Sequence, residues 1–156
     1  MRPNHEHIRL LMQELAGTTS EITAIDAHGN AAWIVHFGPE VEVLAEAAAD
    51  PERIVLSAQL GKPNSAMQQS VCETLLSYNL LWRETGGVKA GRRSPDEEMT
   101  LLFELYADQL SLSDLSIVMV NFSNLTRVWR SYILSDAPTT VEPEQKMGGS
   151  VLDMRV

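Results

Sequence analysis

The sequence predicts an α+β domain: one twisted antiparallel sheet with helices packed on it, in the order helix, strands, helix, hairpin, helix. Two kinds of stretch carry this prediction, those with helical spacing of apolar residues and those in which apolar and polar residues alternate. Alternating stretches that follow one another directly favour antiparallel pairing, with helices covering the sheet. The 156 residues suffice for one domain with a core of ordinary size, which we expect over residues 1–134.

The first helix is expected over about residues 5–16, where four apolar residues recur at helical spacing and Gly17 can end the helix. Leu10 points away from this stripe. The stripe comprises Ile8, Leu11, Met12 and Leu15.

Alternation predicts the first strands over residues 21–26 and 31–37, joined by a turn at 27–30. In the second of them, one face carries Trp33, Val35 and Phe37, and the other carries Ala32, Ile34 and His36. The next segment, 41–50, is ambiguous, because its alanines and glutamates favour helix while its alternation favours strand. We predict a hairpin with residues 53–60, turning at Asp50-Pro51.

A helix over about residues 64–82 has two apolar sides, which is unusual for a helix at the surface of a small domain. One side carries Met67, Val71, Leu75, Tyr78 and Trp82, and the nearly opposite side carries Cys72, Leu76 and Leu80. The second side needs a cover of its own: the chain's tail, the following hairpin, or a second copy of the chain. We favour a second copy, since two-fold homodimers are the commonest soluble assembly.

Residues 86–107 predict a second hairpin that turns at Ser94-Pro95-Asp96, and residues 113–133 predict the last helix, with Ser111 or Ser113 as its N-cap. One broad face of this helix carries Leu115, Val118, Met119, Phe122, Leu125, Trp129 and Ile133. Residues 135–156 contain few large apolar residues, and we expect a flexible C-terminal tail there.

The net charge of −9 argues against nucleic acid and anionic membranes as partners. The sequence has no apolar run of the about 18 residues that a membrane span needs and no signal-peptide pattern at its start. Cys72 is the single cysteine, so the chain cannot form an internal disulfide, and a reducing cytoplasm is its expected location.

Candidate chemical groups are few. His5 and His7 diverge on a helix and make poor metal co-ligands, and Cys72 is better explained as a small apolar residue than as a reactive thiol. The segment GGVKAGRR lacks the ending of a phosphate-binding loop. We therefore expect no catalytic residue, no metal and no cofactor. The alternatives are a small-molecule-binding or catalytic domain that uses a cleft near His36 and Arg92, or a structural adaptor subunit.

Three segments carry a resemblance to a known family. They are LLSYNLLW at the end of the middle helix, the hairpin GGVKAGRRSPDEEMTLLFELYA, and QLSLSDLSIVMVNFSNLTRVWRSYI. In this order they resemble the class I type III secretion chaperones, the Tir chaperone (CesT) family. Ser77, Asn79 and Trp82, together with the chain end Met154-Arg155-Val156, resemble a regulatory member of that family.

The resemblance implies a cytoplasmic homodimer that binds a secreted effector, or its N-terminal segment, in extended form. A regulatory member would also bind an antiactivator protein, so that secretion of its small partner switches transcription on. The family dimerises through the middle helix and the hairpin after it, which places Cys72, Leu76, Asn79, Leu80 and Val88 at the dimer interface. The candidate effector-binding residues are the apolar ones that lie off the core stripes: Leu10, Ile34, Ile117, Val120 and Val128.

Overall fold

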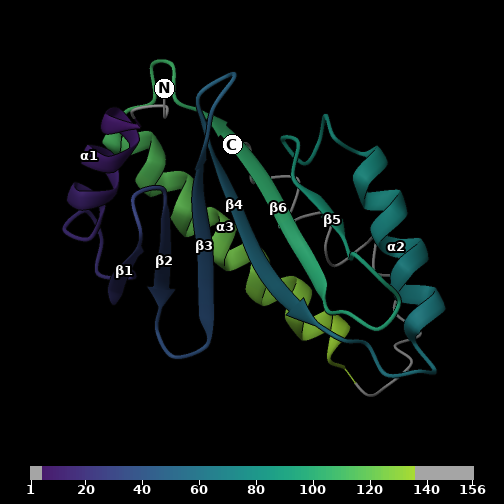
Figure 1. Ribbon diagram of the computed structural model, residues 1–156. Helices are drawn as coiled ribbons and strands as arrows, with labels where there is room; N and C mark the ends of the chain where they lie inside the picture. Colours follow the sequence, from purple (N-terminus) through teal and green to yellow (C-terminus); the bar gives the residue numbers. More distant parts are fainter. Residues whose placement is uncertain (1–4, 136–156) are drawn as a thin grey trace. The chain divides into compact units, whose positions relative to one another are not determined.

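A computed structural model describes residues 5–135 of the chain and confirms the α+β class, with three helices and one six-stranded antiparallel sheet (Figure 1). The helices are α1 (Glu6–Leu15), α2 (Gln68–Leu80) and α3 (Leu112–Ile133). The strands are β1 (Ala24–His28), β2 (Ala32–Phe37), β3 (Val41–Ala48), β4 (Arg53–Gly61), β5 (Lys89–Gly91) and β6 (Met99–Tyr106). The expected tail, 135–156, lies outside the described residues apart from Ser135.

The strands of the sheet follow the order β1-β2-β3-β4-β6-β5, so β1 and β5 are its two edges. Strands β1 to β4 pair antiparallel in succession. The ambiguous alanine-rich segment is strand β3, and its alternate residues Val41, Val43 and Ala45 are buried. Burial of one face of a sheet therefore outweighed the helix propensity of alanine and glutamate.

The chain divides into two compact units. The first contains the residues up to Ala58 and Leu102–Ser123, and the second contains Gln59–Leu101 and the residues from Asn124 onward. Strands β4 and β6 and helix α3 contribute to both units.

In the first unit, α1 buries the four residues of its predicted stripe, and Figure 1 shows the first half of α3 behind β2 and β3. Two contacts tie α1 and the turn after it to α3 and the loop before it. The hydroxyl oxygens of Thr18 and Ser116 are 2.8 Å apart, and Nε2 of His7 lies 3.2 Å from the carbonyl oxygen of Leu110.

Ser111 is the N-cap of α3. Its hydroxyl oxygen accepts a hydrogen bond from the Asp114 N–H at 3.1 Å, and the Asp114 carboxylate accepts one from the Ser111 N–H at 3.4 Å. This reciprocal pairing satisfies two main-chain donors that the helix start would otherwise leave free. Of the two N-cap candidates in the sequence, Ser111 is therefore correct.

Strand β1 begins three residues later than predicted and extends to His28. The Thr23 N–H donates to the carbonyl oxygen of His36 at 2.8 Å, although His36 is the register partner of Ala24. The regular ladder therefore starts only at Ala24, a shift that alternation alone does not reveal.

Candidate functional site

The two-sided character of the middle helix is retained in the structure. On one side, α2 buries Val71, Leu75 and Tyr78 within the second unit. On the other side Leu76 is 69% exposed, Leu80 is 80% exposed and Cys72 is partly exposed. The predicted hairpin does not cover this side, nor does any other part of the chain between residues 5 and 135. Two leucines are thus presented to the surroundings on one face of one helix.

Aromatic contacts fix the buried side of α2 against the end of α3. The rings of Tyr78 and Trp129 meet edge to face with centroids 4.9 Å apart, and Trp129 meets Tyr132 in the same way at 5.9 Å. The Tyr132 hydroxyl lies 3.2 Å from the Thr74 hydroxyl, which donates to the Ser70 carbonyl. Burial raises the pKa of Tyr78 to about 12, and its contact with Trp129 opposes this rise. These contacts determine which face of α2 remains outside.

Asn79 joins α2 to strand β5. Its Oδ1 accepts from the Ala90 N–H at 2.8 Å, and its Nδ2 donates to the Ala90 carbonyl at 2.7 Å. The N–H and C=O of one strand residue point to the same side, so Asn79 occupies one side of β5 as a neighbouring strand would. Val88, also predicted at the interface, is 3% exposed and has almost no side-chain surface left for a partner.

Trp82 departs from the predicted stripe. The sequence placed it with the buried residues of the helix, but α2 ends at Leu80 and helical spacing does not apply beyond that point. Trp82 and its neighbour Leu81 are exposed, and the guanidinium of Arg83 lies 5.2 Å from the centre of the Trp82 ring. The exposed apolar surface of α2 therefore continues past the end of the helix.

The two edges of the sheet differ. Strand β5 has three residues, and Asn79 takes both main-chain groups of its middle residue. Strand β1 has five residues and, among residues 5–135, a strand neighbour on one side only. An edge strand of this kind can accept an extended segment of another chain by main-chain hydrogen bonding.

The five residues predicted to bind an effector lie in α1, β2 and α3. Leu10 is 47% exposed and Ile117 is 56% exposed, and both belong to the first unit. Val128 is exposed in the second unit, whereas Ile34 and Val120 are half-buried. All five have some surface available to a partner, and their role stays a prediction.

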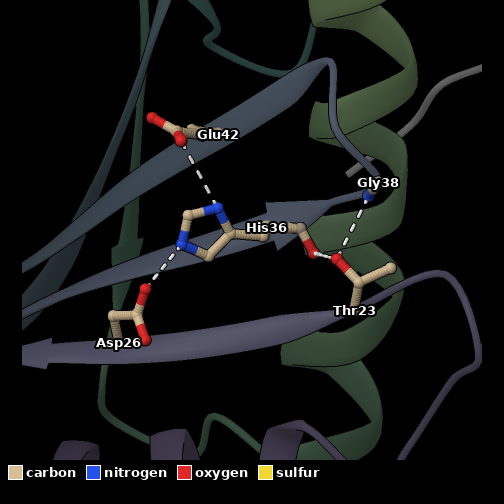
Figure 2. Close-up of polar contacts among 5 residues, drawn as sticks. All are labelled: Thr23, Asp26, His36, Gly38 and Glu42. Carbon is tan, nitrogen blue, oxygen red and sulfur yellow. Dashed lines mark hydrogen bonds and ion pairs between the residues drawn. The ribbon is translucent and has the colours of Figure 1, made fainter.

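His36 lies on the side of the sheet opposite to Trp33, Val35 and Phe37, between two carboxylates. Figure 2 shows its ring between Asp26 of β1 and Glu42 of β3. Its Nε2 lies 2.8 Å from Asp26 Oδ2, and its Nδ1 lies 3.4 Å from Glu42 Oε1. The Thr23 hydroxyl donates to the His36 carbonyl at 3.2 Å and accepts from the Gly38 N–H at 3.3 Å. This arrangement links three adjacent strands.

The second candidate for a small-molecule site, Arg92, belongs to the other unit, where its guanidinium donates to the Pro95 carbonyl at 3.0 Å. An open hollow of about 590 Å³ in the first unit is lined by neither His36 nor Arg92. Its lining includes His7, Glu52 and Tyr106. Within residues 5–135, no group of three or more His, Cys, Asp or Glu side chains is arranged to hold a metal ion. None of the three helices is both long and apolar enough to cross a bilayer.

The family model of the Tir chaperone protein (CesT) family matches residues 11–130 of the sequence. The chain belongs to this family. The match spans most of the chain and confirms the resemblance that the sequence segments indicated.

Solved structures of secretion chaperones have the same fold as this CesT-family protein. The ExsC–ExsE complex matches with a TM-score of 0.68 and 18% identity, covering 83% of this chain and 96% of the other. The HopA1–SchA chaperone–effector complex matches with a TM-score of 0.64 and 16% identity, covering 81% and 95%. The Yersinia pestis type III secretion chaperone SycH, in complex with a stable fragment of YscM2, matches with a TM-score of 0.60 and 18% identity, covering 77% and 97%. ExsC is the regulatory member that the sequence resembles. No sequence among curated proteins matches.

Four exposed large apolar residues of this CesT-family protein were absent from the predicted sites: Leu81, Trp82, Tyr106 and Leu134. Tyr106 is the last residue of β6, and simple alternation from the buried Leu105 places it on the uncovered face. The signal for Tyr106 was therefore present in the sequence. Leu81 and Trp82 depend on where α2 ends, for which the sequence offers no clear stop signal.

Proposed function

We propose that this protein is a type III secretion chaperone that acts as a cytoplasmic homodimer and holds the N-terminal segment of an exported protein in extended, export-ready form. The observation that carries the proposal is the uncovered apolar side of α2, in a chain of the CesT family. The position of β1 at the edge of the described sheet supports the second half of the proposal.

Energetics favour a second copy on the outer side of α2. Burying a leucine-sized side chain contributes about 1.5–3 kcal/mol. In a two-fold dimer Leu76 and Leu80 are buried twice, once from each protomer, and the partly exposed Cys72 adds to the same face. A monomer leaves these side chains exposed and lacks this burial free energy. The missing contribution is a large fraction of the roughly 5–15 kcal/mol by which a typical domain is stable.

The exported segment gains affinity from main-chain hydrogen bonds along β1 and selectivity from apolar contacts. Leu10 and Ile117 are two exposed apolar residues of the same unit that can offer such contacts. Ordering an extended segment costs conformational entropy, so a large surface has to be covered to offset that cost. Binding of this kind needs neither nucleotide nor catalytic group.

A regulatory role is the second proposal, and the pattern of Ser77, Asn79 and Trp82 that resembles a regulatory chaperone favours it. In this role the protein also binds an antiactivator, and the exported partner and the antiactivator compete for it. Export of the small partner then frees the chaperone to sequester the antiactivator.

The dimer is tested by matched leucine-to-aspartate variants on two helices. Leu76→Asp places a charge on the outer side of α2, and Leu10→Asp makes the same chemical change on the exposed side of α1. We expect the wild type and Leu10→Asp to have the mass of a dimer by light scattering at micromolar concentration, and Leu76→Asp to have the mass of a folded monomer. A wild-type monomer, or a dimeric Leu76→Asp variant, would contradict the proposal.

Partner binding is tested with the N-terminal segment of an exported protein encoded beside this chain's gene. We expect the segment to co-purify with the dimer and to slow hydrogen exchange of β1 amides, while exchange at Ala90 stays unchanged. Leu10→Asp should weaken this binding without changing the mass of the free chaperone. Unchanged exchange along β1 in a stable complex would show that the segment binds elsewhere.

A further inference from the structure

The face of the first unit's sheet that points away from the core carries half-buried apolar residues, and the part of α3 that belongs to this unit lies on the other face. Strand alternation places Ile34, Leu44 and Val55 on this face, opposite the buried residues of β2, β3 and β4. Figure 1 shows β2 and β3 in front of α3, so the helix lies on their far side. An apolar strip on the face opposite the core can serve as a docking surface.

Carboxylates surround the centre of this strip on three sides. Ile34 and Leu44 are register partners, which places their Cβ atoms about 4.5–5.5 Å apart. Asp26 is the register partner of Ile34 on the outer strand. Glu42 and Glu46 stand two residues before and after Leu44, about 6.6–6.8 Å away along β3. The apolar pair is therefore framed by three acidic side chains at known positions.

Arginine and lysine side chains do not neutralise this frame. Arg53 is the single Arg or Lys on this face of the first unit's described strands, and its Nε donates to Glu104 Oε1 at 3.1 Å. His36 sits between Asp26 and Glu42, and Glu46 is exposed on the other side of Leu44. The face has excess negative charge beside an apolar centre, which is complementary to an apolar segment flanked by basic residues.

We propose that this face binds a basic amphipathic helix of the exported partner, a proposal that rests on the chaperone function proposed above. On such a helix, residues four apart lie about 6 Å from each other, so a leucine on the Ile34–Leu44 pair can have a Lys or Arg one turn away on either side. Those spacings match the positions of Glu42 and Glu46 along β3. A second copy of this chain suits the face poorly, because its net charge is −9.

The probe is a synthetic helical peptide with leucines on one face and lysines beside them, and its control is the same peptide with glutamate in place of lysine. The full-length protein with labelled methyl groups is titrated with each. We expect the lysine peptide to shift the methyl signals of Ile34, Leu44 and Val55 and to bind about tenfold more tightly than the glutamate peptide. Salt should weaken the lysine peptide's binding, because these charges are exposed.

The double variant Glu42→Lys with Glu46→Lys reverses two charges of the frame. It should weaken binding of the lysine peptide by about tenfold and strengthen binding of the glutamate peptide. The matched control is Glu14→Lys with Glu21→Lys, which makes the same change in net charge at exposed positions away from this strip. If the two double variants weakened lysine-peptide binding equally, the change in net charge alone would explain the effect, and the proposal would be overturned. Peptide-induced shifts confined to other surfaces would also overturn it, as would shifts of these methyl groups that follow protein concentration without peptide and so indicate a second copy.

This experiment contains no exported protein, so its failure leaves the chaperone function standing. Conversely, if the lysine peptide binds this face but the N-terminal segment of the exported protein does not bind the chaperone, the site stands and its natural basic partner is a different protein.

Discussion

The side-chain amide of Asn79 hydrogen-bonds both the N–H and the C=O of Ala90, at 2.8 and 2.7 Å. A helix residue thereby takes the place of a strand neighbour along β5. Asn79 is also a residue of the pattern that resembles a regulatory chaperone, and its place in the fold explains why an amide suits this position. A carboxamide places an acceptor and a donor side by side on one carbon, and Gln carries this group one methylene further out than Asn.

Replacing Asn79 should remove these two hydrogen bonds to different degrees, depending on the new side chain. Asn79→Asp keeps an acceptor for the Ala90 N–H but sets a carboxylate against the Ala90 carbonyl, whereas Asn79→Ala removes both partners. We expect a loss of about 1–3 kcal/mol for the alanine variant, because part-buried main-chain groups lose their partners. Hydrogen exchange should accelerate at the Ala90 amide in Asn79→Ala and remain slower in Asn79→Asp. The Thr85 amide, which donates to Leu81 within the turn after α2, is the internal control.

Gly61 should not tolerate alanine. Its φ is +88°, and an added Cβ would lie 2.9 Å from Cδ2 of Leu134. Strain and crowding together should cost about 1–3 kcal/mol, measured by urea unfolding. Gly91→Ala is the matched control, since a Cβ at Gly91 meets open space. In a Leu134→Ala background the crowding is absent and the strain remains, so Gly61→Ala should cost less stability there than in the wild type; a greater cost would contradict this account.

Tyr78 should make the protein less stable at high pH. Its folded-state pKa of about 12 exceeds the ordinary value of 10.0, so the stability from its neutral form is complete below pH 10 and is lost as the pH rises toward 12. The loss approaches roughly 2–3 kcal/mol at the top of this window. Tyr78→Phe should unfold at a urea midpoint that falls less between pH 9 and 11 than that of the wild type. Tyr106→Phe, which alters an exposed tyrosine, should follow the wild type.

Ser111→Ala should destabilise the start of α3. The variant removes the hydroxyl that accepts from the Asp114 N–H, and loss of a serine N-cap costs about 1 kcal/mol. Ser113→Ala, two residues further along and exposed, should change the unfolding free energy by a few tenths of a kcal/mol. Thermal unfolding of the two variants compares them directly, and equal effects would show that the cap contributes little.

Periodicity predicted most of this fold. The stripe of α1, the alternation of β2, β3 and β4, and the apolar face of α3 all place their buried residues where the structure has them, because a single layer of core selects one side of each element. The uncovered side of α2 was predicted in the same way. Features that depend on contacts between distant segments were missed, such as the start of β1 at Ala24 and the end of α2 before Trp82.

The candidate site was predicted less completely than the fold. Leu76, Leu80, Leu10 and Ile117 are exposed as their places off the core stripes suggest. Asn79 and Val88 were also predicted at the interface, but Asn79 hydrogen-bonds to β5 and Val88 is buried in its own unit. A sequence shows that a residue leaves a stripe, but it does not show whether another part of the same chain receives it.

The asymmetry between β1 and β5 limits how many strands this sheet can recruit. Asn79 seals the β5 side of the described sheet, so growth is possible only beside β1. The described sheet can therefore take one added strand, either from another protein or from a second copy of this chain, and pairing then stops. Under the chaperone function proposed above, this limit would keep the protein from becoming the template of a fibre.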